Sequence, residues 1–300
     1  MAITIVCKWL CANNFQAGFI MNEKTPRYVH EIDQGFGNIV EIKEVLCDCQ
    51  SDFQHIQIFE TAELGRMMML DGIIQFTEFD EYTYQEMMVH PALMVHKNPE
   101  KVLIIGGGDG GVAREVARHK CVKQIDQCEI DGKVVELCRK YVPSMACGFD
   151  DPRMNLHIGD GLEFVRNACD EYDVIIVDST DPIGPGEVLF GREFYQSVHR
   201  ALKADGVVAS QSESIFLYPE IVQRLYGFTR ELFAYNGYAF IAVPTYPAGS
   251  IGVCVACKSH PVDQPQRQLD KTLADELKYY NSDIHRGAFK LPSFAQRWFA

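Results

Sequence analysis

Long apolar runs are missing from this sequence of 300 residues. No stretch approaches the ~18 consecutive apolar residues of a membrane-spanning helix, so we expect no membrane association. The N-terminus, MAITIVCKWLCANNF, is interrupted by Lys8 and lacks a basic start, so it does not look like a secretory leader. Internal repeats and low-complexity segments are also missing, which argues against a solenoid or a long disordered region.

Positive charge is scarce as well. The sequence has 28 Lys and Arg against 41 Asp and Glu, which gives a net charge of −13. Such a field repels nucleic acids and anionic lipids and attracts cations. Solubility alone would explain the negative charge. If several acids lie together at one site, a polycationic small molecule as substrate becomes the more specific hypothesis. We therefore expect small-molecule partners, with no nucleic acid and no membrane.

Cysteine is plentiful, with 11 residues, but a paired metal-type spacing is lacking. The one C-x-x-C, at Cys254 and Cys257, lies in the apolar run IGVCVAC. Residues three apart on a strand face opposite sides, so these two thiols are badly placed to share a metal. We expect no metal site, and reduced thiols in a cytoplasmic protein.

The first part of the chain has the pattern of a small antiparallel β-domain, which we place at residues 1–80. Residues 1–20 show no clear period, and we expect them to be poorly ordered. Short strand-like runs follow from 28 to 77, and Asp71-Gly72 is a strong signal for a two-residue hairpin. The segment 80–96, DEYTYQEMMVHPALMVH, has apolar residues three and four apart and predicts a helix.

A second domain, at residues 81–300, shows a different pattern. From Lys101 onwards, apolar strands such as KVLIIG and YDVIIVDS alternate with helical segments, and two late strands, YAFIAVPTY and SIGVCVACK, complete the series. Strand and helix in alternation predict an α/β fold with a doubly wound parallel sheet of the Rossmann type.

A glycine-rich turn follows the first of these strands. The sequence GGGDGG, residues 106–111, comes after KVLIIG and precedes a helix, and Glu129 ends the next strand. Such a turn lets a ligand approach the backbone at the carboxyl edge of the sheet, and an acid one strand further on suits ribose hydroxyls. Asp109 would repel phosphates, so the loop favours a cationic or neutral ligand, and S-adenosyl compounds fit because they have a sulfonium and no phosphate. Asp160-Gly161 adds an acid at the third strand end, where helix capping is the simpler explanation.

Two further acids, Asp178 and Asp181, follow the fourth strand. Carboxylates at this edge suit an ammonium group: one could take a proton from an amine while the other holds the substrate. A capped turn is the alternative. The segment PIGPGE, residues 182–187, then has the character of a lid or of a plain connection.

These blocks resemble the polyamine aminopropyltransferases. The matching text is LDGIIQFTEFDEYTYQEMMVHPAL, VLIIGGGDGG, DQCEID, IGDG, YDVIIVDSTDPIGP, VPTYPAGSIG and KYYNSDIHRGAFKLPSF, which spans roughly residues 50–300. The resemblance implies a methyltransferase-like Rossmann domain with an N-terminal β-domain, usually in a homodimer. It also implies transfer of an aminopropyl group from decarboxylated S-adenosylmethionine, a co-substrate, to putrescine, without a cofactor. The products are spermidine and methylthioadenosine.

The resemblance also implies roles for particular residues. It makes Asp178 the catalytic acid/base and places Asp109 at the aminopropyl ammonium, Glu129 at the ribose and Asp160-Gly161 at the adenine. Gln54, Gln85 and Pro185 would contact the nucleoside donor, and Tyr84, Asp178, Asp181 and Tyr246 the putrescine.

Three alternatives remain open at this point: an aminopropyltransferase with another amine acceptor, a putrescine N-methyltransferase, and an inactive regulatory paralogue. Asp109 argues against a methyl donor that keeps its carboxylate, and the intact acids argue against an inactive chain. His90 and His119 show neither a triad partner nor metal spacing, and we interpret them as surface or satisfied core residues.

Overall fold

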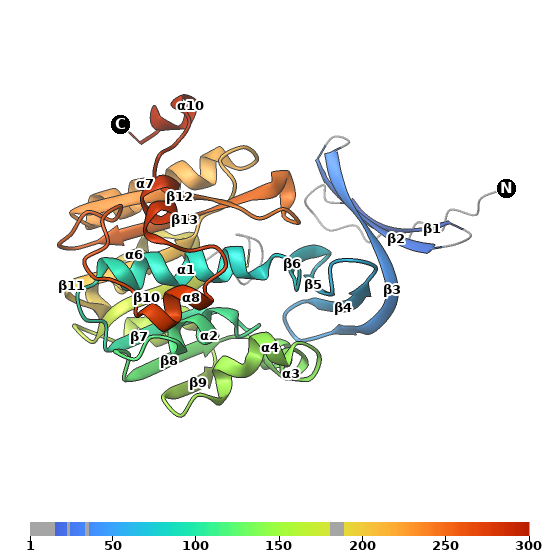
Figure 1. The fold of residues 1–300 in the computed structure, drawn as a ribbon, viewed down its shortest axis with the longest axis horizontal. Coiled ribbons are helices and arrows are strands. Elements are labelled where there is room, and N and C mark those ends of the chain that lie inside the picture. Colours follow the sequence, from blue (N-terminus) through green and yellow to red (C-terminus); the bar gives the residue numbers. More distant parts are fainter. Residues whose placement is uncertain (1–15, 23–24, 34–35, 181–188, 300) are drawn as a thin grey trace. The chain divides into compact units, whose positions relative to one another are not determined.

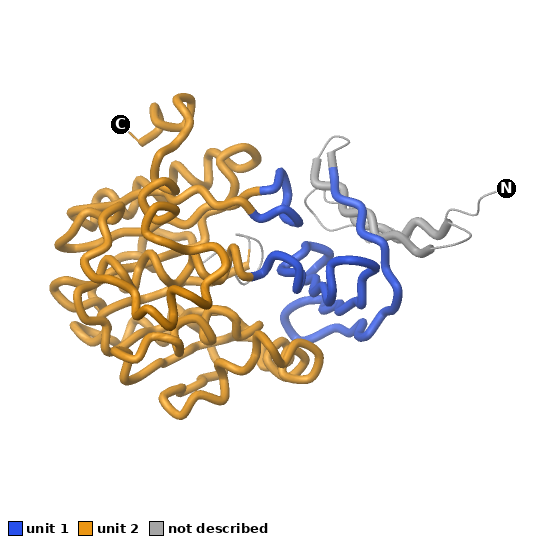
Figure 2. Tube along the Cα trace, viewed as in Figure 1, with its two compact units in different colours: residues 1–81, 243–249 blue, residues 82–242, 250–300 orange. Residues whose placement is uncertain are grey.

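The computed structural model describes residues 16–22, 25–33, 36–180 and 189–299. The chain divides into two compact units (Figure 2). The first contains residues 1–81 and 243–249, and the second contains 82–242 and 250–300. The first unit therefore takes a short segment from late in the sequence in addition to the N-terminal part.

The first unit is built on a six-stranded sheet in sequence order, with every neighbouring pair antiparallel. Its strands are β1 (Gln16–Asn22), β2 (Thr25–Asp33), β3 (Phe36–Gln50), β4 (His55–Thr61), β5 (Arg66–Leu70) and β6 (Ile73–Thr77). The expectation of poor order in residues 1–20 does not hold for residues 16–20, because their backbone pairs with β2. Such pairing needs no hydrophobic period. Residues 1–15 lie outside the described part.

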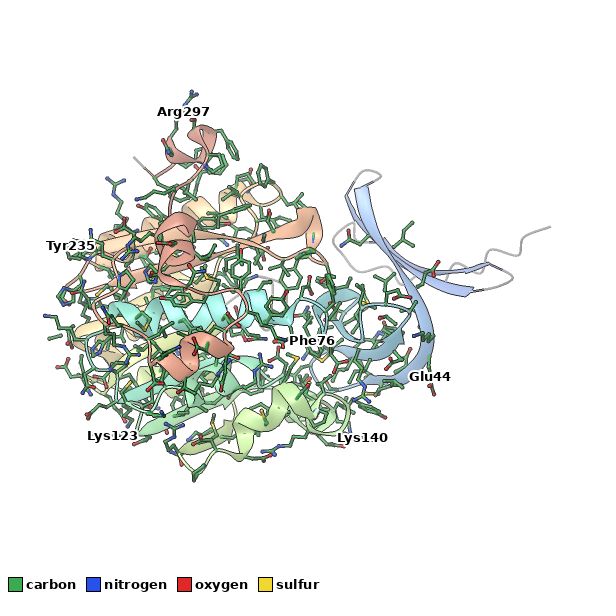
Figure 3. All side chains as sticks on the ribbon, in the orientation of Figure 1. Glu44, Phe76, Lys123, Lys140, Tyr235 and Arg297 are labelled. Atoms are coloured by element: carbon green, nitrogen blue, oxygen red, sulfur yellow. The ribbon has the colours of Figure 1, made fainter. Side chains whose placement is uncertain are left out.

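The predicted hairpin between β5 and β6 is confirmed. Asp71 and Gly72 have φ angles of 48° and 83°, and positive φ at both central positions is what a type I′ turn requires. The sheet buries a core that includes Phe59, Met67 and Met69. Figure 3 labels Phe76 of β6, which is also buried.

The second unit contains a seven-stranded sheet in the order β12-β13-β11-β10-β7-β8-β9 (Figure 1). Its strands are β7 (Lys101–Gly106), β8 (Gln124–Glu129), β9 (Met154–Ile158), β10 (Tyr172–Asp178), β11 (Leu202–Gln211), β12 (Tyr235–Ala242) and β13 (Ser250–Cys257). The five strands from β7 to β11 are parallel, as the alternation predicted.

The expectation of a wholly parallel sheet is wrong for β13, which runs antiparallel to both β11 and β12. β12 ends at Ala242 and β13 begins at Ser250. A parallel partner needs a crossover of a dozen or more residues, whereas this connection is short enough only for an antiparallel return. The sheet is therefore mixed.

The helices of the second unit are α1 (Glu81–Val95), α2 (Gly111–Ala117), α3 (Gly132–Tyr141), α4 (Pro143–Ala146), α5 (Gly161–Arg166), α6 (Arg192–Ala201), α7 (Pro219–Leu232), α8 (Lys271–Glu276), α9 (Ser282–Ala288) and α10 (Ser293–Gln296). Short 3₁₀ segments lie at Cys147–Asp150 and, in the first unit, at Pro247–Gly249. Side chains of α5, α6 and α7 pack with β7, β10 and β11 in one core. Among the described residues, no helix is long and apolar enough to cross a bilayer.

Candidate active site

The glycine turn after β7 lies against the end of β10. Gly106 and Gly107 have φ angles of 82° and 69°, and the N–H of Gly107 donates to the carbonyl oxygen of Asp178 at 2.9 Å. A Cβ atom on Gly106 would lie 2.1 Å from that same oxygen. Only glycine fits this conformation and this approach, so the turn holds the backbone of Asp178 in place.

Asp109 is fixed from two sides. Its Oδ1 accepts the N–H of Gly111, the first residue of α2, at 2.6 Å, and its Oδ2 accepts from the amide of Gln85 at 3.1 Å. Gln85 comes from α1 and is fully buried, and its Oε1 has no hydrogen-bond partner among the described residues. The arrangement leaves one buried acceptor, beside a carboxylate, for a donor group on a ligand.

Asp178 ends β10 and accepts a hydrogen bond from the hydroxyl of Tyr84 at 2.6 Å. Burial of the carboxyl group, followed by the negative charge of Asp109, raises the pKa of Asp178 to about 8. The bond from Tyr84 acts in the opposite direction. At neutral pH this carboxyl group is thus close to its titration point, as suits a group that exchanges protons.

Glu129 ends β8 and is buried. Its Oε1 accepts the N–H of Asp131 at 2.8 Å. Burial is the main cause that raises the pKa of Glu129 to about 7, and the charges of Asp131 and Asp109 add to it. Asp109, Glu129 and Asp178 thus form an acid cluster in which the charge of Asp109 disfavours ionisation of the other two.

Asp160 caps α5, as the simpler of the two sequence interpretations expects. Its Oδ1 accepts the N–H groups of Leu162 at 2.7 Å and Glu163 at 3.3 Å. Gly161 lies against β7, because a Cβ atom there would be 2.4 Å from Cγ2 of Ile105. Capping uses one oxygen of an exposed carboxylate, which leaves the other available to solvent or a ligand.

The remaining predicted residues belong to the first unit or lie outside the described residues. Gln54 and Tyr246 belong to the first unit, where Gln54 closes a turn with Ser51 and the Tyr246 hydroxyl bonds to the carbonyl of Gln75. Asp181 and Pro185 lie outside the described residues. The structure therefore brings together Tyr84, Gln85, Asp109, Glu129 and Asp178, with Asp160 and Gly161 after the neighbouring strand.

Known proteins resemble the chain over most of its length. A family model described as the spermine/spermidine synthase domain matches residues 81–266, and a spermidine synthase tetramerisation domain matches 28–78. The chain belongs to the spermine/spermidine synthase family.

Individual spermidine and spermine synthases are similar to this chain at comparable levels of sequence identity. Spermidine synthase 1 of Hyoscyamus niger is 44% identical over 96% of this chain and 95% of its own length. Spermine synthase of Arabidopsis thaliana is also 44% identical, over 88% of this chain and 76% of its own. A crystal structure of spermidine synthase with the transition-state analogue AdoDATO superposes with a TM-score of 0.83, at 41% identity, over 88% of this chain and 91% of that one. The predicted family, the α/β fold and the enzyme class, an aminopropyltransferase, are confirmed.

Sequence reasoning missed one residue at the site of this aminopropyltransferase, Gln127. It lies on β8 two positions before Glu129, is fully buried, and donates to the carbonyl oxygens of Gly106 and Gly107 at 2.8 Å each. The carbonyl of Gly107 also accepts the N–H of Gly110 at 3.0 Å, so Gln127 adds a second donor there and ties both carbonyls of the turn to β8. The only sign of it in the sequence was a polar residue inside β8, a strand whose side chains are almost all buried.

Replacing Gln127 with Met is expected to weaken donor binding. Met has a similar size and no donor, so both carbonyls lose a hydrogen bond at about 1 kcal/mol each, while that of Gly107 keeps the N–H of Gly110. We expect KM for the donor to rise by about tenfold, with a smaller change in kcat, in steady-state kinetics. Gln124→Met is the matched control, since Gln124 lies on the same strand and its side chain donates to Asp126 at 2.9 Å. Equal effects of both variants would contradict a role at the turn.

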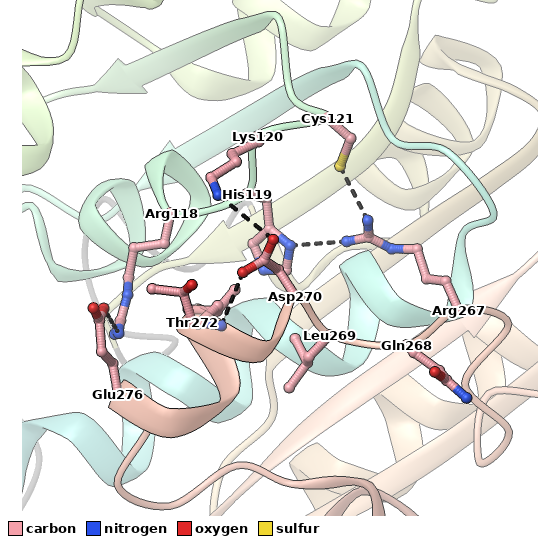
Figure 4. A pocket seen from close by; sticks show the side chains of 11 residues that line it. Arg118, His119, Lys120, Cys121, Arg267, Gln268, Leu269, Asp270, Thr272 and Glu276 are labelled. Atoms are coloured by element: carbon pink, nitrogen blue, oxygen red, sulfur yellow. Dashed lines mark hydrogen bonds and ion pairs between the residues drawn. The ribbon is translucent and has the colours of Figure 1, made fainter.

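A cavity of about 440 Å³ in this aminopropyltransferase lies away from these residues, between the α2–β8 connection and α8 (Figure 4). It contains none of the predicted site residues. Its charged groups are already paired, Arg118 with Glu276 at 3.1 Å and Lys120 with Asp270 at 3.5 Å. We therefore assign it no ligand.

His119 lines this cavity and shares a buried chain of hydrogen bonds with His90. Arg267 donates to Nδ1 of His119 at 2.8 Å, so the ring proton of neutral His119 is on Nε2, which lies 2.9 Å from Nδ1 of His90. His90 in turn contacts Glu115 through Nε2 at 3.2 Å. Burial is the main cause that lowers the pKa of His119 to about 2. Both histidines are satisfied core residues, one of the two interpretations that the sequence allowed.

Proposed function

We propose that the chain transfers the aminopropyl group of decarboxylated S-adenosylmethionine to putrescine, with spermidine and methylthioadenosine as products. The observation that carries the proposal is the carboxyl group of Asp178, held by Tyr84 beside the glycine turn, with a pKa raised to about 8. Family membership and the likeness to a spermidine synthase structure support the same reaction. We propose no cofactor.

The acid cluster supports a cationic donor. Asp109 would take the aminopropyl ammonium together with Oε1 of Gln85, which has no hydrogen-bond partner in the part of the chain that the structure describes. Glu129 would accept from the ribose hydroxyls, and Asp160-Gly161 would lie at the adenine. Gln54 and Pro185 are the other proposed donor contacts. A sulfonium in this field lowers the pKa values of the acids, because a nearby positive charge favours the carboxylate.

The nucleophile in this reaction must be a neutral amine. An alkyl ammonium has a pKa near that of lysine, about 10.4, so only about one amine in 10³ is neutral at pH 7. We propose that Asp178 removes the proton while Asp181, Tyr84 and Tyr246 hold the rest of the putrescine. The neutral nitrogen then attacks the methylene carbon next to sulfur, and methylthioadenosine leaves with the electrons of the broken C–S bond. Holding the two reactants in line supplies much of the acceleration.

Product analysis tests the reaction directly. The purified chain is incubated with decarboxylated S-adenosylmethionine and, separately, putrescine, cadaverine or spermidine, and the products are identified by mass. We expect spermidine from putrescine at the highest rate. A preference for spermidine as acceptor would instead assign spermine synthesis, which the similarity to the Arabidopsis spermine synthase makes the second candidate.

Donor choice should depend on Asp109. S-adenosylmethionine keeps a carboxylate next to its ammonium, and Asp109 repels it, so we expect far less product from this donor than from the decarboxylated one. Asp109→Asn should reduce the ratio of kcat/KM between the decarboxylated donor and S-adenosylmethionine, because a neutral amide does not distinguish the two donors by charge. The measurement is kcat/KM for both donors with both proteins. Equal values for the unaltered chain would rule out this function for Asp109.

We also propose that the chain forms a homodimer through its first unit. A match to a tetramerisation domain supports association through residues 28–78. Among the described residues, the end strands of its six-stranded sheet, β1 and β6, each pair on one side only, and such edges favour association. Light scattering should give a particle mass of about twice the 34.0 kDa of one chain. Four times that mass would replace the dimer with a tetramer, and a monomer at micromolar concentration would contradict the proposal.

We place the enzyme in the cytoplasm. The nine described cysteines are thiols without disulfides, which agrees with a reducing compartment. Fractionation of cells that express the tagged full chain would test this location.

A further inference from the structure

One face of α1 contacts the C-terminal part of the chain. Tyr82, Glu86 and His90 follow each other at intervals of four residues, so they lie on the same side of the helix. Nζ of Lys278 lies 4.9 Å from the centre of the Tyr82 ring, and the rings of His90 and Tyr280 are 5.2 Å apart. Glu86 lies between these two contacts. This part of the chain is thus held along two turns of α1.

Glu86 makes the most directional of these contacts. Its Oε1 accepts the N–H of Lys278 at 2.9 Å, and its Oε2 accepts the N–H groups of Tyr279 and Tyr280 at 2.9 and 2.7 Å. Residues 278–280 belong to no helix or strand, so the carboxylate takes the place of a ladder partner for their N–H groups. Glu86 is buried, where hydrogen bonds to a charged group are strong. The carboxylate therefore fixes the backbone of this segment against α1.

The segment 278–280 is also tied to other parts of the second unit. The Tyr280 hydroxyl donates to Nδ1 of His285 at 2.8 Å, and Nε2 of His285 donates to the carbonyl oxygen of Val262 at 2.9 Å. The side chains of Tyr280 and His285 are buried. The partner of Glu86 is therefore a segment with its own fixed place.

The opposite face of α1 reaches the candidate site. Successive residues of a helix are rotated by about 100°, so Tyr84 lies almost opposite Glu86, and its hydroxyl donates to Asp178 at 2.6 Å. Every residue of α1 from Thr83 to Val95 is buried, so the helix has no single apolar stripe to set its rotation about its axis. Directional contacts therefore matter more here, and Glu86 accepts three of them.

We propose that Glu86 is a positioning residue of the site: by binding residues 278–280 it fixes the rotation of α1 and places the Tyr84 hydroxyl at Asp178. A displacement of ~1 Å in a site can lower a rate by about 10²-fold, so a contact on the far side of the helix bears on the reaction. The inference rests on the proposed function in one respect, the use of Asp178 to remove the proton of the amine.

Titration of Asp178 tests the positioning without any substrate. Aspartate carboxyl groups of the full-length chain are labelled with ¹³C, and the signal that Asp178→Asn removes is followed by NMR. Burial and the charges of Asp109 and Glu129 raise the pKa of Asp178, and the bond from Tyr84 lowers it. Glu86→Gln replaces one acceptor oxygen with an NH₂ group that faces N–H donors. Tyr84 should then move, and Asp178 should titrate at a higher pH than in the unaltered chain, as it should in Tyr84→Phe.

The direction of this shift separates positioning from a simple change of charge. Removing the negative charge of Glu86 would by itself lower the pKa of Asp178, because a like charge disfavours the carboxylate. Glu276→Gln is the matched control, since it also removes a carboxylate close to residues 278–280 in the chain, but this one is exposed and pairs with Arg118. It should leave the titration of Asp178 unchanged.

A milder variant keeps the test decisive where Glu86→Gln fails to fold. Tyr82→Leu removes the ring contact with Lys278 and leaves the carboxylate in place. It should shift the titration of Asp178 in the same direction by a smaller amount. A folded Glu86→Gln protein, or a folded Tyr82→Leu protein in its place, in which Asp178 titrates as in the unaltered chain would overturn the proposal, even if its Tm is lower.

Steady-state kinetics measures the consequence for the reaction. With saturating decarboxylated donor, Glu86→Gln should lower kcat with putrescine by about tenfold or more. The double variant with Tyr84→Phe should lose little beyond Tyr84→Phe alone, because both changes act through one hydroxyl. Additive losses would contradict that route. An unaltered chain that forms no spermidine would reject the proposed function, whereas the titration would still decide the position of Tyr84.

Discussion

Asp178→Asn should lower kcat by about 10²–10⁴, the usual contribution of a general base. Asn keeps the size of the side chain and accepts the bond from Tyr84, but it cannot take up a proton from the amine. The measurement is steady-state kinetics with saturating decarboxylated donor and varied putrescine. Part of the lost rate should return at high pH, where more of the amine is already neutral.

Asp181→Asn separates proton removal from substrate anchoring. We expect it to act mainly through KM for putrescine, because anchoring contributes to ground and transition states alike. The double variant should lose less than the sum of the two effects, since neighbouring groups couple. Near-normal kcat in Asp178→Asn at pH 7, with kcat lost in Asp181→Asn, would reverse the two roles.

The raised pKa of Asp178 also predicts how the free energy of unfolding depends on pH. The pKa of Asp178 is about 8 in the folded chain, against an ordinary value of 3.8 when unfolded. Between these values the folded state binds more protons than the unfolded one, so this group makes the free energy of unfolding fall as pH rises from about 4 to 8. Asp178→Asn removes that dependence. Relative to the unaltered chain, it should raise Tm by about 2 °C or more at pH 8, whereas the two proteins should be nearly equal near pH 4.

Gly106→Ala is expected to have the largest structural effect. The added Cβ would lie 2.1 Å from the carbonyl oxygen of Asp178, and alanine is strained at φ 82°. Neither the turn nor the end of β10 can remain in place. We expect a loss of about 3 kcal/mol or more, a fall in Tm of about 6 °C or more, and at least a 10²-fold lower kcat/KM in the protein that still folds.

Gly159→Ala is the matched control. Gly159 follows β9 near the same edge of the sheet, yet a Cβ there would meet nothing within 4 Å and its φ is not positive. Thermal denaturation of both variants, followed by circular dichroism, should therefore separate them clearly. A Gly106→Ala protein as stable and active as Gly159→Ala would show that the turn is not fixed against Asp178.

The sequence predicts those parts of the fold that depend on local pattern. Continuous apolar runs indicated β7 and β10, and the acids that follow parallel strands came to one edge because such strands all end there. The reversed β13 was not predicted, because its run of apolar residues is buried on both faces and carries no sign of direction. Direction is set by the length of the preceding connection.

In the candidate site, too, local pattern predicts some residues and not others. Asp109, Glu129 and Asp178 were predicted because acids at strand ends stand out against apolar neighbours. Gln127 was missed because its function depends on carbonyls about 20 positions earlier in the chain, whose orientation follows from positive φ. The raised pKa values depend on burial and on the proximity of three acids from different strands and turns, which no local pattern contains.

The late segment 243–249 also bears on how the chain folds during synthesis. Within the first unit, Thr245 donates through its N–H and its hydroxyl to the buried Asp80, and Asn38 donates to the carbonyl of Thr245. Strands β1 to β6 leave the ribosome first, but Asp80 obtains these two hydrogen bonds from Thr245 only after the segment 243–249 has been made. At about 5–20 residues per second, the N-terminal sheet waits roughly 10–30 s in an incomplete form. A nascent chain stalled before residue 243 should therefore be more sensitive to protease in its first 81 residues than the finished protein.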